Sequence, residues 1–84
     1  MPAFEPPTSS ASARFFSAVT PHDSTNFTEA ARGLYVGGAG NVVAVDRNGN
    51  AVTFVGVPAG AILPVVCIRV NATNTTATNI VALY

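Results

Sequence analysis

Residues 41–56 read NVVAVDRNGNAVTFVG, two apolar runs joined by Arg47-Asn48-Gly49-Asn50. Asn-Gly between apolar runs favours a type I′ hairpin, because both central residues tolerate positive φ. The pattern predicts that residues 41–46 and 51–56 pair as antiparallel strands, and it is the strongest local signal in the chain.

Other runs rich in Val, Ile and Thr lie on both sides of this hairpin, separated by Gly, Pro and Asn. Such runs are typical of strands and turns. The further strands are predicted at residues 34–36, 61–70 and 77–84, the tight turns at 37–40 and 57–60, and a polar loop at 71–76. The strand over 61–70 must bend or lie at an edge near Pro64, which has no backbone donor. Residues 27–32 fit a short helical turn or an extended segment equally well.

The expected fold is therefore all-β: a small antiparallel β-sandwich or barrel of about five to six short strands with an extended N-terminal arm. Residues 1–20 are the predicted arm, because prolines stiffen its start and no periodic apolar face follows. Residues 21–84 are the predicted β domain.

Within the arm, the segment from Arg14 to Val19 is the most adhesive part. Two adjacent aromatic residues on a polar segment favour docking on a neighbouring surface, because their large apolar area is stabilising only when it is removed from water. The candidate interface residues are Arg14, Phe15, Phe16 and Val19. A local strand packed on its own domain is the alternative.

Composition indicates association. Of the 84 residues 49% are hydrophobic and only 10% charged, against about 25% charged in typical soluble domains. Strands such as 42–45 are apolar on both faces, and a domain of this size is too thin to cover both. The sequence therefore predicts a homo-oligomer, for which closed cyclic symmetry is the usual arrangement.

Several classes of function are disfavoured. Four Arg, no Lys and four acids build no basic patch, so no nucleic-acid partner is expected. The uncharged run 51–68 contains two Gly and two Pro, which a membrane-spanning helix would not carry, and so no membrane association is expected. The chain starts without a basic and then apolar segment, which predicts synthesis in the host cytoplasm without secretion.

No catalytic or cofactor site is expected either. His22, Asp23 and Ser24 are the residue types of a hydrolytic triad, but sequence neighbours do not reach the required alignment, and they predict a surface turn. Scattered acids and one His predict no metal site. Cys67, the single cysteine, lies in an apolar strand and is expected to pack as a small hydrophobe. The protein is therefore predicted not to be an enzyme and to need no cofactor.

Four short motifs occur in a recognisable order: GLYVGGAGNV at 33–42, VTFVGVPAG at 52–60, ILPV at 62–65, and the Thr-rich segment 72–84 that ends in IVALY. Over about residues 18–84 the chain resembles the spike base proteins of tailed phages and phage-derived gene transfer agents. Where that family has an arginine-rich strand after Leu-Pro-Val, this chain has Val66-Cys67-Ile68 before Arg69.

The resemblance implies a structural protein of the virion, on the capsid surface, that forms an oligomeric base and anchors a head spike or fibre. A pentamer is favoured at a capsid vertex, with a trimer as the alternative. The implied partners are the major capsid protein and a head fibre protein. Two other functions stay open: a capsid cement or decoration protein without a fibre, and a small carbohydrate-binding module that uses exposed aromatic residues.

Overall fold

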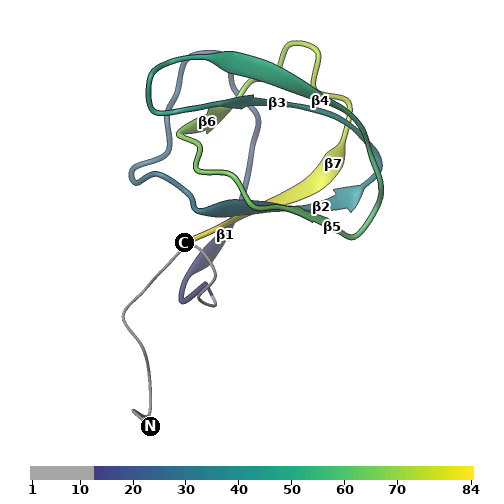
Figure 1. Ribbon diagram of the computed structural model, residues 1–84, viewed down its shortest axis with the longest axis horizontal. Helices are drawn as coiled ribbons and strands as arrows, with labels where there is room; N and C mark the ends of the chain where they lie inside the picture. Colours follow the sequence, from purple (N-terminus) through teal and green to yellow (C-terminus); the bar gives the residue numbers. More distant parts are fainter. Residues whose placement is uncertain (1–12) are drawn as a thin grey trace, which may run out of the picture.

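The computed structural model describes residues 13–84, which form two antiparallel β-sheets and no helix (Figure 1). One sheet has the strand order β1-β7-β2-β5 and the other the order β4-β3-β6. The strands are β1 (Phe16–Ala18), β2 (Gly33–Gly38), β3 (Gly40–Val45), β4 (Ala51–Val57), β5 (Ala61–Leu63), β6 (Arg69–Val70) and β7 (Thr78–Leu83). The predicted all-β sandwich is confirmed, with seven strands in this part of the chain.

The predicted hairpin is present as β3 and β4, with Val43 opposite Thr53 and Val45 opposite Ala51. Its central turn residues are Arg47 and Asn48, and of the loop residues only Gly49, which follows them, has positive φ (85°). The predicted type I′ turn centred on Asn48-Gly49 is therefore wrong. The amide of Gly49 donates to the carbonyl of Asp46 at 3.0 Å. This is a type I turn followed by a left-handed glycine, the usual three-residue hairpin loop.

The Asp46 carboxylate explains the choice of this turn. It accepts hydrogen bonds from the amides of Asn48 at 2.8 Å and Asn50 at 2.9 Å. An Asp at the first position of a type I turn commonly satisfies backbone donors in this way. These bonds hold the pKa of the Asp46 carboxyl below its ordinary value, with the Asn50 amide as the main cause.

A β-bulge in β4 returns the end of this strand to the core. Val42 lies opposite Phe54, but Gly40 lies opposite Val57, so β4 has one residue more than β3 in this interval. Gly56, with φ of 70°, provides the left-handed conformation that such a bulge uses. As a result Val57 is buried although strict alternation from Phe54 would turn it outward.

The chain crosses from one sheet to the other at two places that were predicted differently. Residues 37–40 are no tight turn: β2 continues through Ala39 into β3, which belongs to the other sheet. The predicted strand over 61–70 is two short strands in different sheets, β5 and β6, separated by an irregular segment that contains Pro64. The first crossing joins the inner strands β2 and β3, and the second joins the edge strands β5 and β6.

Gly40 is required at the first crossing because another segment passes close to it. A Cβ atom placed there would lie 2.6 Å from the backbone nitrogen of Ala77. Asn41 then fixes this approach, since its carbonyl accepts from the amides of Thr76 at 2.9 Å and Ala77 at 3.1 Å. The glycine therefore serves close backbone packing.

The core lies between the two sheets and contains no buried polar or charged side chain among the described residues. Leu34 and Val36 of β2 face Val42 of β3, and all three are fully buried. Val43 and Val45 are also buried, although they lie outside this core cluster. The expectation that other subunits must cover the second face of this strand is thus wrong for β3.

The first described strand pairs with the last. Phe16 lies opposite Leu83 in an antiparallel register, and the amide of Arg14 donates to the carbonyl of Tyr84 at 2.8 Å. Residues 27–32 form no helical turn: the chain bends at Thr28 and Glu29, and Ala31 forms an isolated bridge to Cys67. Of the segment predicted as an arm, residues 16–18 thus belong to a sheet, while residues 1–12 lie outside the described part of the chain.

Candidate assembly surfaces

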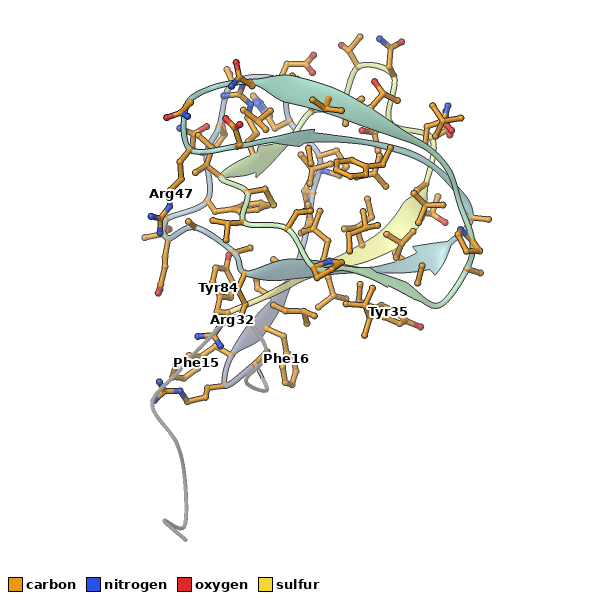
Figure 2. All side chains as sticks on the ribbon, in the orientation of Figure 1. Phe15, Phe16, Arg32, Tyr35, Arg47 and Tyr84 are labelled. Carbon is orange, nitrogen blue, oxygen red and sulfur yellow. The ribbon has the colours of Figure 1, made fainter. Side chains whose placement is uncertain are left out.

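The four candidate interface residues have different environments. The side chains of Phe15, which precedes β1, and Phe16, its first residue, are 70% and 72% exposed and point to opposite sides, as successive residues of an extended chain do (Figure 2). Arg14 is also exposed. Val19 packs against the core of its own chain, and its amide donates to the carbonyl of Ile80 at 2.9 Å.

Phe16 belongs to a larger apolar surface on the outside of the four-stranded sheet, which we call the sheet face. Residues directly opposite in an antiparallel register point to the same side of a sheet. One row across the four strands is Ala18, Val81, Tyr35 and Ile62, and the next is Phe16, Leu83 and Gly33. Neither row contains a charged residue.

The most exposed members of the sheet face come from three different strands. Ile62 of β5 is 61% exposed and Tyr35 of β2 is 38% exposed, whereas the residues on either side of each pack toward the core. Figure 2 shows Phe16 and Tyr35 on the same side of the sheet, away from the other sheet. The face is continuous because β7 places Val81 and Leu83 between them.

A second apolar surface lies along β4, which is the edge strand of the three-stranded sheet. Beside it a groove of about 200 Å³ opens between the hairpin and the segment that crosses between sheets. Its apolar lining includes Val52 and Phe54 on one side and Val65 and Val66 on the other, with Asp46 at the rim. We call β4 and this groove the hairpin edge.

Sequence patterns point to the hairpin edge only in part. The run Val52-Thr53-Phe54-Val55 is apolar on both sides, and the structure leaves Val52 and Val55 57% and 77% exposed. The sheet face has no such signal, because its members are separated by up to 67 positions and meet only through non-sequential strand pairing. The outer edge of β4 has no strand paired to it among the described residues, and such a free edge is a known template for pairing with another chain.

Polar loops at one end of the sandwich are held by side-chain hydrogen bonds. The Asp23 carboxylate accepts from the Thr73 amide at 2.9 Å and the Thr73 hydroxyl at 2.7 Å. These bonds, the amide first, lower the pKa of the Asp23 carboxyl. Arg69 joins the same loops, since its Nη1 donates to Asn26 Oδ1 at 2.9 Å.

The His22 ring has a local structural role. Its Nδ1 accepts from the backbone amides of Ser24 at 3.1 Å and Thr25 at 3.2 Å, which closes a turn. Because Asp23 is engaged by Thr73, the three adjacent residues do not form the relay of a hydrolytic triad. The predicted surface turn is confirmed.

Cys67 is buried in the core cluster, as predicted from its apolar strand context. Burial raises the pKa of the Cys67 thiol to about 11. A thiol of this kind is chemically inert at neutral pH, because the thiolate is the reactive form.

Among residues 13–84, no three His, Cys, Asp or Glu side chains gather in a way that would hold a metal ion. This part of the chain also has no helix long and apolar enough to cross a membrane.

The fold and its exposed apolar surfaces define a class: a small all-β structural protein whose outer faces are suited to contact with other proteins. No protein-family model matches the sequence, and no curated protein matches it significantly. Among solved structures, the chain is similar to a chain of the capsid of a native gene transfer agent particle computed with C5 symmetry. The two share 38% identity over 100% of both chains, with a TM-score of 0.85.

This similarity shows the family. The chain belongs to the family of that gene transfer agent capsid component, and it is a structural capsid protein of phage-derived type, located in the virion.

Proposed function

We propose that this protein forms an oligomeric base on the capsid surface that anchors a head spike or fibre. The observation that carries the proposal is the full-length similarity to a chain from a capsid computed with fivefold symmetry. The order of the sequence motifs over residues 18–84, which resembles spike base proteins, adds the fibre to this proposal.

Five copies per base would match the fivefold symmetry of the particle that contains the similar chain. The two exposed apolar surfaces support association, because monomeric proteins rarely leave large contiguous apolar patches in water. Arg14 and Phe15 directly precede β1, and both are exposed. They are proposed to contact the capsid protein or a neighbouring copy, since Arg and aromatic residues dominate protein interfaces.

Stoichiometry in purified particles tests this function. Quantitative mass spectrometry against the major capsid protein should give about five copies per fivefold vertex. Particles from a strain without the gene should keep an intact capsid and lose the fibre when imaged by electron microscopy. A capsid that keeps its fibre without this protein would refute the anchoring role.

A cement protein without a fibre is the second candidate, because an apolar, weakly charged β domain also suits lateral capsid contacts. It predicts a copy number close to that of the major capsid protein, and capsids that become fragile to heat when the gene is deleted.

The double variant Phe15→Ala, Phe16→Ala should reduce incorporation of the protein into particles if it forms the proposed spike base. Thr28→Ala, in an exposed loop, is the matched control.

A further inference from the structure

We infer that the subunits of the base associate head to tail, with the sheet face of one copy on the hairpin edge of the next. This inference rests on the proposed function in so far as it takes the base to be a homo-oligomer. The sheet face and the hairpin edge are then the two surfaces through which the subunits of the base contact each other.

The number of surfaces is the first argument. A twofold contact uses the same patch on both partners, whereas a ring of more than two copies needs two different, complementary patches on each subunit. The described residues provide two patches of different shape on different sheets. In Figure 1 the four-stranded sheet and β4 lie on opposite sides of the sandwich, so one copy can contact two neighbours at once.

Shape complementarity is the second argument. The sheet face is a flat surface from which Phe16 and Ile62 project, being 72% and 61% exposed. The hairpin edge contains a groove of about 200 Å³ lined by Val52, Phe54 and Val66. A groove of this size is suited to a projecting apolar side chain, which would be desolvated there as interface anchors are.

The lack of charge disfavours a strongly charged partner for the sheet face. Its two cross-strand rows contain no ionisable group other than the Tyr35 hydroxyl. A charged partner would lose hydration against this surface without gaining an ion pair. The hairpin edge has Asp46 at its rim but an apolar lining, and so a second copy matches each surface.

The size of the chain is compatible with two such contacts. A stable interface buries about 800 Å² on each partner. The chain has an accessible surface of 5330 Å², so two such contacts would cover roughly three-tenths of it. Phe16 alone offers on the order of 150 Å² of exposed apolar area.

Complementation between two variants tests the head-to-tail arrangement. The first variant carries Phe16→Glu and Ile62→Glu on the sheet face, and the second carries Val52→Glu and Val66→Glu at the hairpin edge. All four side chains are exposed, so the substitutions should leave the fold intact, which circular dichroism and thermal melts verify. A third variant with the same added charge in loops, Thr28→Glu with Ala72→Glu, is the matched control.

Wild type and control should form the same oligomer by analytical ultracentrifugation and native mass spectrometry. Each surface variant alone should be monomeric from micromolar to millimolar concentration. Mixed in equal amounts, the two should form a heterodimer and nothing larger, because only one intact pair of surfaces remains.

Three results would overturn the assignment. Dimers of the hairpin-edge variant alone would show that the sheet face pairs with itself. A mixture that stays monomeric would show that the two surfaces do not match. A surface variant that keeps the wild-type oligomer but fails to enter particles would assign that surface to the capsid. A monomeric wild-type protein would instead refute the oligomeric base itself.

Discussion

Gly40→Ala is the substitution for which the structure gives the clearest magnitude. The new Cβ would lie 2.6 Å from the nitrogen and 2.8 Å from the Cα of Ala77, and 2.8 Å from the carbonyl carbon of Thr76. All three are backbone atoms that Asn41 holds by hydrogen bonds, so they cannot rotate away. Overpacking typically lowers the free energy of unfolding by about 1–3 kcal/mol. Because the neighbours here are backbone atoms, we expect a loss of about 3 kcal/mol for Gly40→Ala. For a domain of this size that corresponds to a Tm lower by roughly 12–24 °C.

Thermal and urea unfolding, followed by circular dichroism at one fixed protein concentration, measure the effect. The concentration must be fixed because association raises the Tm of the folded state. Gly60→Ala is the control, since Gly60 has φ of 85° and open space around its Cβ position. Its free energy of unfolding should fall by only about 1–2 kcal/mol, which is the cost of holding Ala in a left-handed conformation. If Gly40→Ala destabilises no more than Gly60→Ala, close backbone packing at the crossing is not what requires glycine.

Four further predictions follow from individual contacts. Gly49→Val should lower the free energy of unfolding by about 1–3 kcal/mol, because Gly49 has positive φ, whereas Gly49→Asn should be milder in the same urea titration. The Asp46 carboxylate has a lowered pKa, so its contribution to stability is present above about pH 4 and is lost as the pH falls through the folded-state pKa. Urea titrations at pH 7 and pH 3 should therefore show a smaller acid-induced loss in Asp46→Asn than in wild type. Alkylation of native Cys67 at pH 8 should be on the order of a hundredfold slower than in the urea-unfolded chain, because its pKa is raised to about 11; equal rates would contradict its burial. Deleting residues 1–20 removes β1 and the contact of Val19 with the core, and should lower the Tm relative to a chain that lacks only residues 1–12.

Local signals predicted the hairpin well, because Asp46, Asn48 and Gly49 satisfy their own backbone donors within a few residues. They also predicted a strand at residues 34–36. The turn type was missed because Asn-Gly also suits a type I turn with Gly49 after it, which the Asp46 side chain selects.

The crossings between sheets were not predictable from the same signals. Glycine at position 40 indicates a turn or a close approach equally, and only the path of Ala77 decides between them. The run 61–70 is apolar throughout, so no alternation shows that β5 and β6 belong to different sheets.

Of the predicted interface residues, Phe15 and Phe16 are exposed in the structure, and they could be chosen from the sequence because two adjacent aromatic residues stand out on a polar segment. Val19 was also chosen, and the structure packs it inward on its own core. Tyr35 and Ile62 escaped notice, since they become neighbours of Phe16 only through the order β1-β7-β2-β5.

The pairing of β1 with β7 has a consequence for the time at which subunits become competent to associate. Among the described strands β1 pairs only with β7, so a growing polypeptide on the ribosome cannot complete the four-stranded sheet before residues 78–83 have been made. Until then the row that joins Phe16 to Leu83 does not exist, and neighbouring nascent chains have no finished surface to recognise. In the proposed oligomer, association would thereby be postponed until after translation of this last strand, when the released domain meets other completed copies.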